Sequence, residues 1–176
     1  KGWAVGDGSM MLNFEGHAEG VFVFKIDNRE EFMISGGSDC AMKLWDIEKR
    51  RCVKILEDHT GRVNDVVIAR GRDKFYSASS DTTIKVWKLK DDFKCMNSLF
   101  DHRGPVNCLA LTHKGTYLFS GSSDKTIKIW DTNDLKVIAS LEEHDKEVTA
   151  LALSQNERYL FSGGADCKIM IWLIKE

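Results

Sequence analysis

The sequence lacks the features that usually divide a chain or send it to a membrane. It has a single proline, Pro105, no Gly- or Ser-rich linker and no low-complexity tract. No segment keeps a helical period, and no stretch approaches ~20 consecutive apolar residues, so neither long helices nor a membrane span are expected. Residues 1–8 lack the apolar run of a secretory signal. Because the chain begins at Lys rather than Met, we interpret it as an excised fragment or a processed product.

Charge and cysteine usage exclude further classes. The formal net charge is -2 at pH 7, which disfavours a nucleic-acid partner, since such proteins usually carry a strongly basic surface. The 5 cysteines include no C-x-x-C pair. An odd count without metal-ligand spacing is typical of reduced, packed thiols in a cytoplasmic or nuclear protein, so neither zinc nor another cofactor is expected.

What the sequence does contain is a repeat. Residues 120–131 read S-G-S-S-D-K-T-I-K-I-W-D, and edited copies cover residues 35–46, 77–88 and 162–173. In every copy a Ser precedes an Asp by four residues, and that Asp precedes a Trp by six. The tryptophans at positions 3, 45, 87, 130 and 172 step by 42, 42, 43 and 42 residues, and a His lies 22 residues before each Asp. A fixed internal period of this length indicates a repeat architecture.

Within each unit, four short segments favour β-structure. The segment after each His is apolar at nearly every position, which predicts strands buried on both faces at residues 21–26, 63–68, 106–111 and 148–153. Two more strands follow it, and a looser outer strand precedes each His, the first of them over residues 11–14. The predicted units cover residues 11–46, 52–88, 95–131 and 137–173, and residues 1–9 are a possible remnant of a preceding unit.

Four short strands per unit of ~40–45 residues, ending in Trp-Asp, resemble the WD40 repeat family over essentially the whole chain. Trp45-Asp46 and Trp130-Asp131 carry the namesake pair, and Gly16-His17 carries the Gly-His pair of the family. The other two units have lost the Asp after Trp. The resemblance implies an all-β fold of β-propeller blades, with four units of four antiparallel strands each, in a single repeat domain over residues 1–176.

Each unit also contains a His, a Ser and an Asp that could be drawn as the base, nucleophile and orienting group of a hydrolase. The family resemblance implies a structural role instead, in which these residues and a Trp form a buried hydrogen-bonded network. Repetition favours the structural interpretation, because an enzyme needs one site and this chain has four sets. We therefore expect no enzymatic activity. The four sets are His17, Ser35, Asp39 and Trp45; His59, Ser77, Asp81 and Trp87; His102, Ser120, Asp124 and Trp130; and His144, Ser162, Asp166 and Trp172.

If those residues are structural, function belongs to the loops. By the family resemblance, the loop after each His and the turn before each Asp share one face. Arg62 and Arg103 come from neighbouring units, and a pair of arginines could bind an acidic or phosphorylated peptide, although ordinary solvated charges are the alternative. The candidate partner-binding residues are Glu19, Arg62, Arg103, Asp145, Glu147, Ser38, Ser80 and Ser123.

Propellers usually have 4–8 blades, and this chain supplies about four units. The outer strand over residues 11–14 could complete the last unit, as ring closure in the family does. Trp3 keeps the repeat register, however, which favours a segment of a longer array. Two copies could then pair head to tail into an eight-bladed ring, or the rest of a longer chain could supply the missing blades.

The leading interpretation is therefore a scaffold or adaptor that binds protein or peptide partners on a rigid propeller in the cytoplasm, or in the nucleus. The alternative is a targeting or substrate-recruitment domain of a larger enzyme, of kinase or ubiquitin-ligase type, whose catalytic part lies outside this chain.

Overall fold

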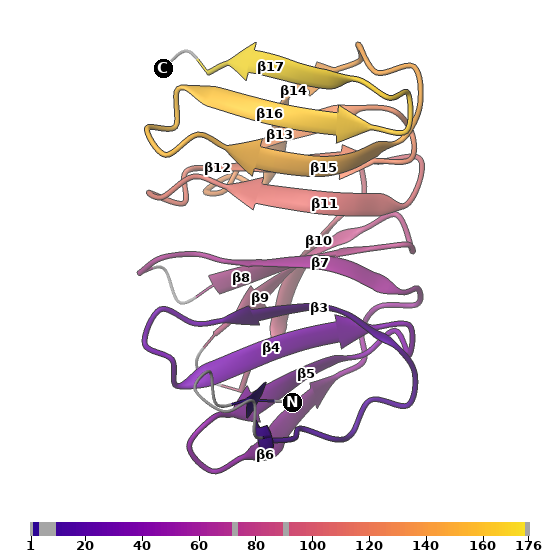
Figure 1. Cartoon of the computed structure of the whole chain (residues 1–176). Coiled ribbons are helices and arrows are strands. Elements are labelled where there is room, and N and C mark those ends of the chain that lie inside the picture. The colour runs from indigo at the N-terminus through magenta and orange to yellow at the C-terminus, as the bar shows by residue number, and fades with distance from the viewer. Residues whose placement is uncertain (1, 4–9, 72–73, 90–91, 175–176) are drawn as a thin grey trace.

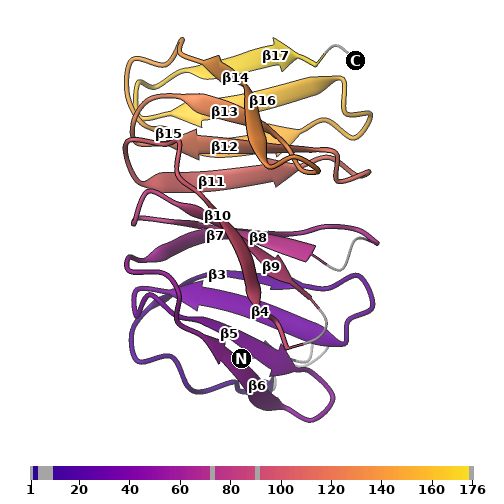
Figure 2. The same cartoon turned by 180° about the vertical axis from the view of Figure 1, so that it is seen from behind.

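The computed structural model describes residues 2–3, 10–71, 74–89 and 92–174. Within these residues every regular element is a β-strand, and four antiparallel sheets stack on one another (Figures 1 and 2). The all-β fold class that the repeat predicted is confirmed. We refer to the four sheets, in chain order, as blades 1 to 4.

Blades 1 to 3 have four strands each, and each strand pairs with the next along the chain. Blade 1 comprises β3 (Val21–Ile26), β4 (Phe32–Gly37), β5 (Met42–Asp46) and β6 (Arg51–Leu56). Blade 2 comprises β7 (Val63–Ile68), β8 (Lys74–Ser79), β9 (Ile84–Lys88) and β10 (Cys95–Leu99). Blade 3 comprises β11 (Val106–Leu111), β12 (Tyr117–Ser122), β13 (Ile127–Asp131) and β14 (Lys136–Leu141). In the described part of the chain, blade 4 has three strands rather than the predicted four, β15 (Val148–Leu153), β16 (Tyr159–Gly164) and β17 (Ile169–Leu173).

The first strand of each blade, which we call its inner strand, occupies the residues that the apolar runs predicted. Each has a register shift directly after its first Val, as between Val63 and Asp65 in β7. In the turn between the second and third strands, the residue directly after the Asp has a positive φ. This angle is 73° at Thr82 and 75° at Lys125. This left-handed conformation is costly for a residue other than glycine, so tertiary contacts must hold these turns in place.

Consecutive blades pack through the same contact. The inner strand of each blade lies on the first two strands of the blade before it. A Cβ added at Gly36 would lie 2.5 Å from Cγ1 of Val63, and one added at Gly121 would lie 2.6 Å from Cγ1 of Val148. In these two blades the close approach of a valine from the next blade leaves no room for a Cβ. Between blades 2 and 3 the repeat places Ala78 at this position.

The prediction that inner strands are buried on both faces fits β11 but is wrong for β3 and β15. In β11 most side chains are buried, whereas Val21, Phe24 and Ile26 of β3 are 53%, 61% and 50% exposed. In β15 only Val148 is buried, and half of the residues are exposed. The difference arises because β3 and β15 belong to the first and last of the four blades, so each packs on another blade from one side only.

The N-terminal segment does not complete the last blade in this structure. β2 (Met10–Leu12) pairs with β1 (Gly2–Trp3), at the opposite end of the stack from β17 (Figure 1). Trp3 lies opposite Met10, in the register in which Trp45 lies opposite Cys52. β1 and β2 thus pair as a third and an outer strand do. The rest of the expected remnant, Lys1 and residues 4–9, lies outside the described residues.

The valine–glycine contact gives a matched pair of substitutions. Gly121→Ala places a methyl group 2.6 Å from Val148 and 2.7 Å from Sγ of Cys108, so blades 3 and 4 must move apart. We expect it to lower the free energy of unfolding by about 1–3 kcal/mol, the usual cost of an overpacked core. Gly163→Ala is the control, because its methyl group meets only Cβ of Ala150 at 3.7 Å. Chemical denaturation measures both variants, and equal losses would contradict this packing.

Candidate functional site

The four residues of each repeated set form one hydrogen-bonded chain, which runs from Trp through Ser and His to Asp. In blade 3, Nε1 of Trp130 donates to Oγ of Ser120 over 2.8 Å. That hydroxyl lies 2.7 Å from Nε2 of His102, and Nδ1 of the same ring lies 2.7 Å from Asp124. All three bonds form together if Ser120 donates to Nε2 and the ring donates its Nδ1 proton to the carboxylate. The geometry therefore favours the tautomer of His102 with the proton on Nδ1.

The same hydrogen-bonded chain of Trp, Ser, His and Asp occurs in all four blades. The Trp–Ser distance is 2.8 Å each time, and the Ser–His distance is 2.7 or 2.8 Å. The four serines are between 0% and 3% exposed. A serine hydroxyl that is buried and engaged by both a Trp and a His has no open path to a substrate, so the geometry gives no support to the hydrolase interpretation.

The aspartate at the end of each chain is held as a carboxylate. Burial from water opposes ionisation of Asp81, but hydrogen bonds from His59 and Thr83 outweigh it and hold the pKa of that carboxyl below its usual range. Burial likewise opposes ionisation of Asp124, and the bonds from His102, the Arg103 amide and Thr126 lower its pKa. The pKa values of the other two aspartates are lowered in the same way.

Each aspartate also connects two loops. Asp124 accepts the backbone N–H of Arg103 from the loop after the His, and that of Thr126 from the turn after the Asp. The equivalent loop donors in the other blades are Ala18, Thr60 and Asp145. The loop after each His and the turn before each third strand therefore lie at the same edge of every blade. We call the surface formed by these loops and turns the loop face.

On the loop face, Arg62 is held in a defined position. Its guanidinium carbon lies 4.6 Å from the ring centre of Phe22, and its Nε donates to Oδ1 of Asn64 over 2.8 Å. Asn64 in turn donates to Oγ of Ser80 and to the carbonyl of Val106 in the next blade. Arg62 is therefore ordered by an aromatic ring and by a side chain that is itself fixed between two blades.

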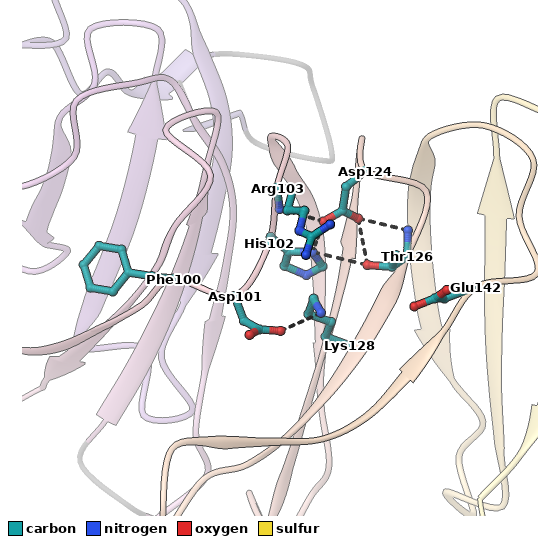
Figure 3. Close-up of a pocket in the computed structure, with 8 residues that line it drawn as sticks. All are labelled: Phe100, Asp101, His102, Arg103, Asp124, Thr126, Lys128 and Glu142. Carbon is teal, nitrogen blue, oxygen red and sulfur yellow. Dashed lines mark hydrogen bonds and ion pairs between the residues drawn. The ribbon is translucent and has the colours of Figure 1, made fainter.

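Arg103 has different surroundings from Arg62. It lines an open cavity of about 580 Å³ in blade 3, beside His102 and Asp124 (Figure 3). Nζ of Lys128 in the same cavity lies 2.5 Å from a carboxylate oxygen of Asp101. The remaining lining residues are Phe100, Thr126 and Glu142. The cavity mixes both signs of charge, so it is a less defined anion site than the surroundings of Arg62.

The other predicted loop residues are spread over the four blades. Glu19, Asp145 and Glu147 are exposed, and Asp145 forms an ion pair of 2.6 Å with Lys168. Ser38, Ser80 and Ser123 are half-buried, and of these Ser80 and Ser123 accept hydrogen bonds from Asn64 and Asn107.

Sequence reasoning missed Phe22, Asn64 and Asn107. All three occupy the second position of an inner strand, where Thr149 stands in blade 4. Asn107 bridges Ser123 and the carbonyl of Val148 as Asn64 bridges Ser80 and Val106. For Asn64 and Asn107 the signal in the sequence was a polar residue inside an apolar run. Phe22 is apolar and gave no such signal.

A half-buried carboxylate lies between blades 2 and 3. Asp65 accepts the backbone N–H of Leu109 from the next blade over 2.8 Å, and that of Val66 over 2.8 Å. Burial raises the pKa of Asp65, and these two bonds and the charge of Lys25 offset the rise only in part. Burial also raises the pKa of the neighbouring Cys108 thiol to about 12, so that thiol is unreactive at neutral pH.

No group of three or more His, Cys, Asp or Glu side chains among the described residues is placed to hold a metal ion. Among the same residues, no helix is long and apolar enough to cross a membrane.

Comparison with known proteins gave consistent results. The family model for the WD domain, G-beta repeat, matches residues 8–46, 50–88, 93–131 and 135–172. The chain is 32% identical over 66 residues to cell division control protein 4 of Saccharomyces cerevisiae, which is 38% of this chain and 8% of that protein. It is 33% identical over 88 residues to nuclear distribution protein nudF of Aspergillus oryzae, 49% of this chain and 19% of that protein.

A third relative is a probable E3 ubiquitin ligase complex SCF subunit, sconB, of Talaromyces stipitatus. It is 31% identical over 52 residues, 30% of this chain and 8% of that protein. The matched segments thus span less than a fifth of the length of each of these relatives.

The lowered pKa of Asp124 predicts the direction of an acid effect. Its pKa in the folded chain lies below the unfolded value of 3.8, so the folded state binds fewer protons in acid. Stability from this carboxylate is complete well above pH 3.8 and is lost as the pH falls toward the folded pKa. We expect Asp124→Ala to cost about 2–3 kcal/mol at pH 7, on the order of 5–10 °C in Tm. The loss should shrink below pH 3.8 in thermal melts, and an unchanged Tm at pH 7 would contradict the role.

Asp65 predicts the opposite sign. Its pKa is raised on folding, so the folded state binds more protons and the charged form opposes folding at neutral pH. Asp65→Asn removes the charge and keeps an acceptor for the N–H of Leu109, at the cost of the hydrogen bond that Oδ1 of Asp65 accepts from the N–H of Val66. We expect it to raise Tm by a few degrees at pH 7, with the gain fading as the pH falls through the raised pKa. A lower Tm at pH 7 would show that the charge stabilises the blade interface.

Proposed function

The chain belongs to the WD40 repeat family, and from this premise we propose that it is a scaffold or adaptor that binds an acidic or phosphorylated segment of a protein partner on its loop face. Members of this family are generally interaction modules without catalysis. The repeated His, Ser, Asp and Trp sets are assigned to stability in this proposal. The variable loop residues are assigned to the partner.

One observation carries the proposal, the fixed position of Arg62. Nε is occupied by Asn64 and one face of the guanidinium lies over Phe22. The residue remains exposed, and its two Nη groups would match the two oxygens of a carboxylate or phosphate. Because the side chain is already ordered, binding costs less conformational entropy than it would at a free arginine.

The residues around Arg62 favour a particular kind of peptide. Phe22 is 59% exposed even beneath the guanidinium, so it offers an apolar surface directly beside the anion-binding group. An acidic or phosphorylated residue next to an apolar residue fits this pair. Exposed Arg103 lies in the next blade and would add a second, less ordered cation.

Charge along the loop face would orient the peptide. Arg62 and Arg103 lie in blades 2 and 3, whereas exposed Glu147 lies in blade 4 and Asp145 is paired with Lys168. A partner with its anionic end over blades 2 and 3 avoids like-charge contacts in blade 4, and complementary charge of this kind fixes orientation more than affinity.

A second candidate is that this module recruits substrates or targets a larger enzyme, of kinase or ubiquitin-ligase type. It is favoured by the relative named as a subunit of an SCF ubiquitin ligase complex, and by the small share of the relatives that the chain covers. Both candidates use the same loop face. We further propose the cytoplasm or nucleus as the location, because all 5 cysteines are free thiols.

An arrayed peptide library tests the proposal, with each sequence in unmodified, phosphorylated and Asp-substituted form. We expect binding to be enriched for phosphorylated or acidic residues next to apolar ones. Arg62→Glu should weaken the best peptides at least about tenfold by fluorescence polarisation, which corresponds to ~1.4 kcal/mol. Arg103→Glu should weaken them less.

Arg29→Glu is the matched control, because exposed Arg29 lies in the turn after β3, at the edge of blade 1 opposite the loop face. It should leave affinity unchanged. No enrichment of anionic peptides, or equal effects of Arg62→Glu and Arg29→Glu, would refute the proposal.

A further inference from the structure

Phe100 departs from the repeat at an exposed position. Two residues before each His, the other three units carry a glutamate, which is Glu15, Glu57 or Glu142. All three glutamates are exposed and Phe100 is 73% exposed, so the fold does not require an apolar side chain at this position. Aromatic side chains without a packing role in the monomer are candidates for contact with a partner, since such residues are enriched in binding interfaces.

Two open cavities adjoin Phe100. The first is the cavity of about 580 Å³ that also contains Arg103 (Figure 3). The second, of about 530 Å³, lies between outer strand β10 of blade 2 and strands β13 and β14 of blade 3. Phe100 and Asp101 line both cavities. We call the surface that the two cavities form the Phe100 hollow; it runs from the loop face onto the rim between blades 2 and 3.

Most charged groups in the first cavity already have partners within it. Lys128 forms its ion pair with Asp101, and the carboxylate of Asp124 is held by the hydrogen bonds described above. In the part of the chain that the structure describes, no ion pair involves the guanidinium of Arg103 or the carboxylate of Glu142. The cavity therefore offers one cation and one anion to a ligand.

The arrangement of these groups defines an order. Figure 3 shows Phe100 and Glu142 on opposite sides of the cavity, with Arg103 between them. Glu142 directly follows the last residue of β14, and the hydroxyl of Ser140 donates to it only over a long distance of 3.3 Å. A ligand that crosses the cavity thus meets an aromatic ring, then a cation, then an anion.

An extended peptide fits this surface better than a small molecule does. Sites for small molecules usually enclose most of the ligand, whereas both cavities here are open to solvent. A chain segment of several residues can cross from one cavity to the other past Phe100. Complementary charge then selects its side chains, because Arg103 matches a carboxylate and Glu142 matches a basic group.

We propose that the Phe100 hollow binds a segment of a protein partner in which an acidic residue stands between an apolar and a basic residue. The apolar side chain packs on Phe100, the acidic one binds Arg103 and the basic one binds Glu142. This interaction shares Arg103 with the proposed loop-face binding but needs neither Arg62 nor a phosphate group. It can therefore hold where peptide binding at Arg62 fails.

Short synthetic peptides test this by fluorescence polarisation, with one apolar, one acidic and one basic residue placed in every order between Gly-Ser spacers. We expect the orders with the acidic residue in the middle to bind most tightly. Phe100→Glu should weaken these peptides at least about tenfold, since an aromatic anchor commonly supplies this much. This variant carries the residue of the other three units, so the fold should be kept; circular dichroism verifies it, and Phe100→Gln repeats the test otherwise.

Glu142→Arg provides a gain as well as a loss. It should weaken the peptides that end in a basic residue and strengthen those in which a second acidic residue replaces the basic one. Met96→Glu and Glu57→Arg are the matched controls, because they make the same changes at exposed residues that line neither cavity. Both should leave affinity unchanged, and so should Arg62→Glu.

The outcomes separate the alternatives. Absence of binding, equal affinity for every order, or equal effects of Phe100→Glu and Met96→Glu would overturn the proposal. Free phenylalanine that binds as tightly as the peptides would indicate a small-molecule site and overturn it too. A loss with Arg62→Glu as large as that with Phe100→Glu would place these peptides at Arg62 instead. Failure of phosphorylated peptides to bind through Arg62 refutes the loop-face proposal alone.

Discussion

The buried hydrogen-bonded chain of Trp, Ser, His and Asp is the interaction on which the rest of this structure depends. It joins the third strand to the second through Trp130 and Ser120, and the second to the preceding loop through His102. Every polar atom in it has a partner, and the described chain shows no buried side-chain nitrogen or oxygen without one. Since an unpaired buried polar group costs about 1–3 kcal/mol, loss of any member affects the whole blade.

The same chain of bonds explains how a structural core prepares a binding surface. Its aspartate ends at the loop face and holds the backbone of the loop that carries Arg62 or Arg103. Because the aspartates bind backbone N–H groups of these loops, the hydrogen bonds place no restriction on which side chains the loops carry. The core can therefore stay constant from blade to blade while the loops differ in charge, as they do between blades 2 and 4.

The sequence predicted most of what repeats and little of what does not. Fixed spacing located the residues of all four hydrogen-bonded sets, and apolar runs located the inner strands. The Phe22–Arg62 contact could not be predicted, because it joins two blades and because Phe22 lies at the register shift of β3. The exposure of β3 and the pairing of β2 with β1 were missed for a related reason, since burial depends on which sheets are neighbours and a repeat pattern does not encode where the stack ends.

The proton positions in the buried chains test the central claim most directly, and they are visible by nitrogen NMR of the histidine rings. The account predicts that His17, His59, His102 and His144 carry a proton on Nδ1, bound to Asp, while Nε2 accepts from Ser. Exposed His113 supplies the reference within the same chain. Protons on Nε2 in these four rings, or spectra like that of His113, would contradict the account.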